Sequence, residues 1–179
     1  MKAIRIIVLC GCAMILLVAA VPRQEAEMRV QAPAGPHPGF EKMKTLAGEW
    51  EGTSGEGNPA TVSYRLVSGG TALEETLTSS HEGNRETMVT MYYLDGDGLM
   101  MTHFCAAGNQ PRMRAGALSA AGKTLAFAFR DATNLPNPNT GHMRNLEITF
   151  VDAKRITQQW TWRENGQEKK DVFRLTRRK

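Results

Sequence analysis

Residues 46–57 read LAGEWEGTSGEG, in which a single tryptophan, Trp50, stands between Gly48 and Gly52 at the entrance to a run of turn residues. The residues that follow alternate between apolar and polar side chains, so Trp50 falls at the start of the first of many predicted strands. A large indole at the beginning of such a chain can fill the end of a barrel. We therefore expect Trp50 to plug one end of a β-barrel, with Gly48 and Gly52 in structural roles.

A short helix is expected just before this tryptophan. Phe40, Met43 and Leu46 recur at intervals of three, which predicts one helix over residues 39–46 with a single apolar stripe. Gly48 marks its end. We expect this helix to join Trp50 at the base of the barrel.

After Gly48 the chain consists of short runs, many with period-two alternation, separated by clusters of turn residues. Asn165-Gly166 is the strongest hairpin signal, because both central positions of a type I′ turn require positive φ. The runs predict ten strands with approximate cores at 48–53, 60–67, 72–79, 87–94, 98–106, 111–118, 123–130, 145–151, 154–163 and 168–177.

Consecutive strands joined by tight turns form an antiparallel meander, and an open meander would expose two strand edges to aggregation. The predicted fold is therefore all-β, an antiparallel up-and-down β-barrel of about ten strands with a short N-terminal helix plugging the base. A two-sheet sandwich is the alternative. The one long connection, residues 131–143, contains prolines that exclude a central strand. It either covers the barrel mouth or is disordered.

Alternation also predicts which side chains point into the barrel. The facing of the fourth strand, 87–94, stays unresolved, because both of its faces carry apolar residues. On the other strands the predicted inward residues are Val62, Tyr64, Leu66, Leu73, Leu77, Leu99, Met101, Leu125, Phe127, Phe129, Leu146, Ile148, Phe150, Ile156, Trp160, Trp162, Phe173 and Leu175.

Three polar residues interrupt these apolar faces: Glu75, His103 and Gln158. A buried carboxylate without a partner costs several kcal/mol or takes up a proton, so an inward Glu75 needs a donor, with His103 a candidate. If the barrel encloses a cavity, such groups orient a ligand in an apolar pocket. The alternative is that both lie hydrated at the rim. The expected ligand-binding residues here are Glu75, Tyr92, His103, Trp160 and Trp162.

Arg112 and Arg114 alternate and so share one face of the sixth strand. If they point inward, their guanidinium groups can hold a carboxylate or phosphate, and we include both as candidate ligand-binding residues. If they point outward, Met113 and Ala115 fill the interior instead. The sequence leaves the two orientations open.

The N-terminal residues are typical of an exported protein. Lys2 and Arg5 precede an apolar run that extends to Val21, and small residues around Ala20 suit a cleavage site. We predict a signal peptide at 1–20, a flexible linker at 21–38 and a barrel domain at 39–179, in a periplasmic or secreted protein. A membrane anchor is the alternative, although the run is shorter than a typical span, as is a lipid anchor at Cys12.

Without the first twenty residues the chain carries 20 basic and 18 acidic residues, a near balance that argues against a nucleic-acid partner. Of three cysteines, Cys10 and Cys12 lie in the predicted signal. Cys105 then stays without a disulfide partner. No stable membrane insertion is expected after cleavage.

The stretch LAGEWEGTSGEG, with the short helix before it and the strands after it, resembles the opening of the calycin superfamily of lipocalin-like and nitrobindin-like barrels. The motifs HPGFEKMKTLAGEWEG, SYRLVSGGTALEETL and NGQEKKDVFRLTRRK carry a closer resemblance. They are most similar to an uncharacterised bacterial family of exported lipocalin-like proteins. The resemblance implies a barrel whose Trp50 stacks against a basic side chain, for which Arg163, Arg174 and Arg177 are candidates. Nitrobindin-like barrels bind haem through a histidine near the C-terminus. This chain has none after His142, so a haem would depend on His103.

Other chemistry has weaker support. No histidine pair has the spacing of a zinc hydrolase, and Asp95-Gly96-Asp97-Gly98 suits a hairpin turn better than a calcium loop, so we predict no metal site. His103 and Cys105 share a strand face but lie about 7 Å apart, which is poor geometry for proton transfer. We favour a buried, inert Cys105 over an enzyme.

The sequence thus predicts an exported barrel that binds a small apolar or amphipathic molecule without chemical change. A haem or gas-ligand protein and a structural envelope protein with a filled barrel are the alternatives.

Overall fold

The computed structural model describes residues 36–81 and 83–179. The described residues belong to one unit, which holds every element described below. The predicted signal peptide at 1–20, and the part of the predicted linker up to residue 35, lie outside the described residues.

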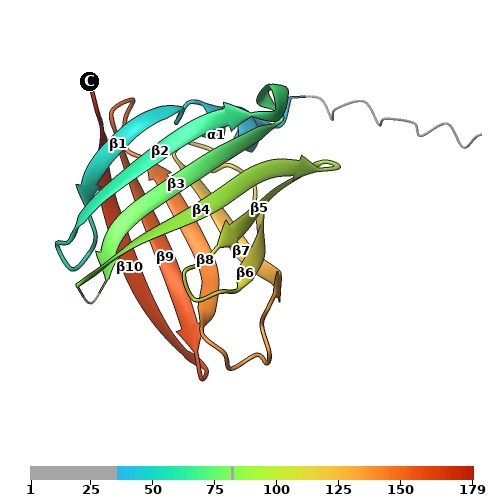
Figure 1. Ribbon diagram of the computed structural model, residues 1–179. Coiled ribbons are helices and arrows are strands. Elements are labelled where there is room, and N and C mark those ends of the chain that lie inside the picture. Colours follow the sequence, from blue (N-terminus) through green and yellow to red (C-terminus); the bar gives the residue numbers. More distant parts are fainter. Residues whose placement is uncertain (1–35, 82) are drawn as a thin grey trace, which may run out of the picture. The chain divides into compact units, whose positions relative to one another are not determined.

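One short helix precedes ten strands (Figure 1). The predicted ten runs correspond one to one with these strands. The elements are α1 (Pro38–Lys44), β1 (Gly48–Thr53), β2 (Pro59–Val67), a 3-10 turn η1 (Ser68–Gly70), β3 (Ala72–His81), β4 (Asn84–Asp95), β5 (Gly98–Phe104), β6 (Gln110–Ala115), β7 (Thr124–Thr133), β8 (His142–Phe150), β9 (Arg155–Glu164) and β10 (Gln167–Arg177).

The strands form a closed antiparallel barrel in which each pairs with its neighbours in sequence and β10 pairs with β1. The closing register sets Trp50 opposite Arg177 and Gly52 opposite Leu175. The prediction of a ten-stranded up-and-down barrel is confirmed, and the sandwich alternative is wrong. Closure pairs β1 with β10 and so removes the two free edge strands that an open meander would expose to aggregation.

Helix α1 lies at one end of the barrel (Figure 1). Trp50 belongs to the same buried cluster as the apolar residues of that helix. Phe40, Met43 and Leu46 are buried there, as the spacing of three predicts. Trp50 is buried too, and its indole N–H donates to the carbonyl of Leu46 at 2.8 Å. The indole therefore joins the segment after the helix to the first strand.

Arg177, near the end of β10, covers the same tryptophan. Its guanidinium carbon lies 4.3 Å from the centre of the Trp50 ring, which is a cation–π contact. Its two terminal nitrogens donate to the carbonyls of Ala47 at 2.7 Å and Thr45 at 2.6 Å. Of the three arginines that the resemblance offers as partners for Trp50, the one that stacks on it is Arg177.

Several boundaries differ from the predicted ones. The helix spans Pro38–Lys44 rather than 39–46, with His37 capping it by accepting from the amide of Phe40. The long connection is residues 134–141 rather than 131–143, because β7 continues to Thr133 and β8 begins at His142. The end of β7 and the start of β8 carry polar residues that interrupt the apolar alternation, so the sequence did not predict that these two strands extend so far. Leu66 was expected inside but is 45% exposed, since it lies at the end of β2 beyond the packed interior.

The wall of the barrel opens between β7 and β8, at the end opposite α1. Their pairing ends at Ala128 and Asn145, after which β7 continues along β6 while β8 continues along β9. Each strand carries a β-bulge just beyond that point. Arg130 is the extra residue in β7 and Arg144 the extra residue in β8, since the register passes over each of them. Bulges of this kind bend a strand and redirect a side chain.

Gly52 provides a test of barrel closure. A Cβ atom there would lie 1.8 Å from the carbonyl oxygen of Arg174 in β10, so Gly52→Ala must push β1 away from β10. We expect a loss of about 2–3 kcal/mol in the free energy of unfolding, measured by urea denaturation.

Gly116→Ala is the matched control, because a Cβ atom there meets nothing closer than 3.9 Å. We expect its effect to stay within about 0.5 kcal/mol. Equal losses in the two variants would contradict the close β1 and β10 contact.

Candidate functional site

A group of polar side chains crosses the interior of the barrel. In the strand register Tyr64 of β2 lies beside Glu75 of β3, Glu75 beside Thr90 of β4, and Thr90 beside His103 of β5. All four are at most 2% exposed. The unresolved facing of β4 is thereby settled, since Met88, Thr90 and Tyr92 are its buried residues.

Hydrogen bonds link this group to the opposite wall. The Tyr92 hydroxyl donates to Glu75 Oε2 at 2.7 Å, and His103 Nδ1 and Thr90 Oγ1 share a bond of 2.9 Å. From β9, the amide nitrogen of Gln158 donates to the Tyr64 hydroxyl, and the indole of Trp160 donates to Gln158 Oε1 at 3.1 Å. The ring of Trp160 also lies against His103, with ring centres 4.7 Å apart.

Two atoms of the group have no hydrogen-bond partner among the described residues, Glu75 Oε1 and His103 Nε2. Burial raises the pKa of Glu75, although the bond from Tyr92 and the nearby Tyr64 and Gln158 oppose that rise by favouring the charged form. Burial lowers the pKa of His103 from 6.5 to about 4, so its ring is neutral at pH 7. Leaving a polar atom buried and unpaired costs about 1–3 kcal/mol.

The predicted ligand-binding residues divide into three sets. Glu75, Tyr92, His103 and Trp160 belong to this interior group and are not at the rim. Trp162 is half-buried nearer the end of β9, and its ring lies where a Cβ atom on Gly141 would be. It therefore packs against the connection between β7 and β8.

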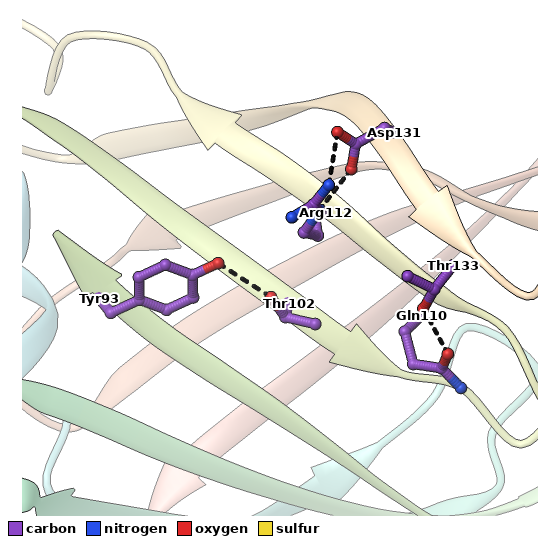
Figure 2. A network of polar contacts seen from close by, with 6 residues as sticks. All are labelled: Tyr93, Thr102, Gln110, Arg112, Asp131 and Thr133. Carbon is purple, nitrogen blue, oxygen red and sulfur yellow. Dashed lines mark hydrogen bonds and ion pairs between the residues drawn. The ribbon is translucent and has the colours of Figure 1, made fainter. Parts of the chain in front are cut away.

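Arg112 and Arg114 form the third set and point outward. Arg112 makes a two-pronged ion pair with Asp131 on the outer face, where Figure 2 also shows Tyr93 bonded to Thr102 and Gln110 to Thr133. Arg114 pairs with Asp97 at 3.3 Å. The inward orientation is excluded, because Met113 between them fills the interior. Neither arginine joins the interior group.

A hollow lies elsewhere, where β7 and β8 separate. It has a volume of about 560 Å³. We call it the β7–β8 cleft. Its walls are strand residues Phe129, Arg130, Asp131, Ala132, His142, Arg144 and Arg163, and loop residues Leu135, Pro136, Asn137 and Pro138.

The cleft combines an aromatic floor with basic groups. The rings of Phe129 and His142 pack with centres 4.8 Å apart, and the Arg144 guanidinium lies 4.9 Å from the centre of the Phe129 ring. His142 Nδ1 donates to the carbonyl of Thr140 at 2.7 Å, which fixes the ring. A flat molecule can pack against such a surface while its polar part meets a guanidinium group.

Alternation in sequence could not identify this cleft. It places Arg130 outside, next to the inward Phe129, and gives Arg144 no special position. The bulges at both residues depend on how β7 and β8 pair with their other neighbours. The one available signal was the length and proline content of the connecting segment.

Other kinds of site find little support. Among residues 36–81 and 83–179, no three His, Cys, Asp or Glu side chains gather as metal ligands would. A second hollow of about 150 Å³ lies near Pro59, Ser79 and Arg85. Cys105 is a free thiol whose pKa is raised by burial, as an unreactive cysteine requires. In the described part of the chain no helix has the length and apolar character needed to cross a bilayer.

Comparison with known proteins identifies no relative in sequence. No protein-family model matches the chain, and no curated protein does. Among solved structures, the chain is similar to that of EF1p2_mFAP2b bound to DFHBI, with a TM-score of 0.40 and 9% identity over 78% of this chain and 98% of that one. A likeness this distant carries no argument about ligand or activity.

His103 makes a testable contribution to the pH dependence of stability. Because its pKa is depressed in the folded protein, its stabilising effect is complete above pH 6.5 and is lost as the pH falls towards about 4. Wild type should lose about 3 kcal/mol relative to His103→Gln over that interval, measured by urea denaturation. Parallel curves for the two proteins would show that the ring is not desolvated.

Glu75 should act in the opposite direction. Its pKa is raised in the folded protein, so its contribution is complete below pH 4.5 and is lost as the pH rises through the raised value. The free energy of unfolding of wild type should therefore fall relative to that of Glu75→Gln as the pH increases from 4.5. A difference that grows in favour of wild type would contradict the desolvation of this carboxyl.

Proposed function

We propose that the protein is an exported small-molecule-binding barrel whose ligand, an amphipathic molecule, occupies the β7–β8 cleft. The observation that carries this proposal is a hollow of about 560 Å³ with both apolar and basic walls. Pockets for small organic molecules have volumes of about 300–1,000 Å³ and a few polar groups in a mainly apolar lining. Binding by burial and electrostatic contact needs no catalytic residue.

The position of the cleft supports the same role. Its residues come from three strands, β7, β8 and β9, and from the 134–141 connection. The strands hold one wall rigidly, while the connection forms the other, and ligand sites often combine a rigid scaffold with a loop. Trp162, predicted from the sequence as a ligand contact, packs beside Gly141 at the edge of this region.

The interior polar group is a less favoured place for the ligand. Glu75 Oε1 and His103 Nε2 are buried there without hydrogen-bond partners among the described residues, and a ligand could supply those partners. However, its other polar atoms are bonded to one another, and neither hollow described above is lined by Glu75, Tyr92, His103 or Trp160. We therefore assign these residues to the stability of the wall.

A haem does not fit these residues. His103 Nε2 lacks a partner, as an axial ligand would, but the ring is 1% exposed and packs on Trp160. A porphyrin beside it would have to displace Trp160 and the bonds that hold it. No haem or gas-ligand function is proposed.

A structural protein with a filled barrel is the second candidate function. The closely bonded interior group favours it, because side chains that satisfy one another need no ligand. The two functions differ in whether the β7–β8 cleft is occupied in the cell.

Export is proposed from Lys2, Arg5 and the apolar run that follows them. N-terminal sequencing of the protein recovered from cells that make it tests this. A first residue near Val21 is the expected result, and a chain that retains Met1 would contradict cleavage.

The test of function compares two variants by native mass spectrometry of protein from the same cells. Ala132→Trp fills the cleft, which Ala132 lines, whereas Ala126→Trp adds the same ring at an exposed position of the same strand. We expect a small-molecule mass to be retained by wild type and Ala126→Trp and lost from Ala132→Trp. A bare polypeptide in all three samples would favour the structural function instead.

A further inference from the structure

We propose that the β7–β8 cleft selects ligands in which an anionic group is attached to a flat apolar ring, such as an aryl carboxylate, sulfonate or phosphate. This inference rests on the proposed function and adds the ligand class to it. It follows from the charge of the cleft, the positions of its arginines and the surface between them.

Two of the three basic groups of the cleft have no ion-pair partner among the described residues. Three guanidinium groups line it, those of Arg130, Arg144 and Arg163. Among the described residues, no carboxylate forms an ion pair with Arg130 or Arg144, and Arg163 reaches Glu168 only at 4.0 Å. By contrast, Arg65, Arg112 and Arg155 each have a carboxylate within 2.8 Å. The cleft therefore holds two unpaired arginines, whereas several arginines elsewhere on the barrel are paired.

The one carboxylate in the lining is already engaged. Asp131 accepts two hydrogen bonds from Arg112, one to each carboxylate oxygen, on the outer face of the sheet (Figure 2). The charge of Asp131 is therefore balanced by Arg112 rather than by Arg130, its neighbour in sequence. The lining keeps an excess of two positive charges, counted from three arginines and one aspartate.

The two β-bulges explain why arginines occupy this place. Arg130 and Arg144 are the residues that the β6–β7 and β8–β9 registers pass over, and both lie beside the point where β7 and β8 separate. A bulge adds one residue that has no partner on the neighbouring strand, and this breaks the regular alternation of side chains at that point. Bulges are commonly found where a strand redirects a side chain towards a functional site.

The apolar part of the lining defines the other half of the ligand. Phe129 and His142 form an aromatic surface, and Leu135, Pro136 and Pro138 come from the loop. Because Arg144 already rests on the Phe129 ring, its guanidinium is positioned beside that surface rather than extended into solvent. A ring packed here would place an attached anion next to the guanidinium.

Size excludes a polyanion as the intended partner. A hollow of about 560 Å³ accommodates one small organic molecule, and the charge of the chain after residue 20 is nearly balanced. Nucleic-acid sites instead spread many basic groups along a surface. The cleft fits a discrete anion with an apolar ring.

The experiment measures the binding of naphthalene-2-sulfonate and of neutral 2-naphthol by calorimetry and by amide chemical shifts. Wild type should bind the sulfonate at least about tenfold more tightly than the naphthol, and added salt should weaken only the sulfonate. Arg144→Gln and Arg130→Gln should each weaken the sulfonate by about three- to tenfold while leaving the naphthol almost unchanged.

Arg174→Gln is the matched control. Arg174 is exposed on β10 and does not line the cleft, so its loss changes net charge equally without touching the site. Its affinity for the sulfonate should stay within about twofold of wild type. An equal loss in Arg174→Gln and Arg144→Gln would overturn the proposal, since a general charge effect would then explain the binding.

Ala132→Trp separates failure of this inference from failure of the proposed function. If both probes bind equally and Ala132→Trp abolishes both, the cleft binds small molecules but the anionic class is wrong. If neither probe binds the cleft, or Ala132→Trp changes nothing, both proposals fail. Circular dichroism and thermal unfolding of every variant show whether a loss of binding reflects a loss of folding.

Discussion

The pairing of the first strand with the last is the contact on which the rest of the barrel depends. It joins residues more than a hundred positions apart, so the chain must lose much conformational freedom before this contact forms. Trp50 and Arg177 stabilise the junction. The Trp50 indole donates to the carbonyl of Leu46 and is covered by the guanidinium of Arg177. The same guanidinium donates to the carbonyls of Ala47 and Thr45. Gly52 allows the two backbones to approach closely. Without this junction β1 and β10 would be free edges.

Closure also determines the character of the interior. Polar side chains that a closed wall turns inward must find partners inside, because water cannot reach them freely. Tyr64, Glu75, Tyr92 and Gln158 do so largely through one another. The resulting network links β2, β3 and β4 to β9 across the barrel and supports a rigid wall. The candidate binding site lies instead where that wall is interrupted, between two strands that separate at their bulges.

Much of the fold was accessible from the sequence, and less of the site. Asn165 and Gly166 both have positive φ, as a type I′ turn requires, and each of the ten predicted strand cores overlaps one observed strand. For Glu75 and His103 the sequence left two positions open, inside the barrel or hydrated at its rim, and the structure shows both residues buried inside. Arg112 and Arg114 were singled out because they alternate, yet the bulge residues Arg130 and Arg144 line the cleft. A bulge is a mismatch between two strands, and a single strand's pattern does not contain it.

The sequence by itself determined the local properties of this protein: strand positions, turns, the short helix and the apolar face within most strands. These follow from period-two alternation and from glycine and asparagine at positive φ, which act over a few residues. The tertiary structure alone decided which arginine covers Trp50, which face of β4 is inside and where β7 leaves β8. The physical reason is that these features depend on hydrogen bonds and packing between strands distant in sequence, whose register no single strand specifies.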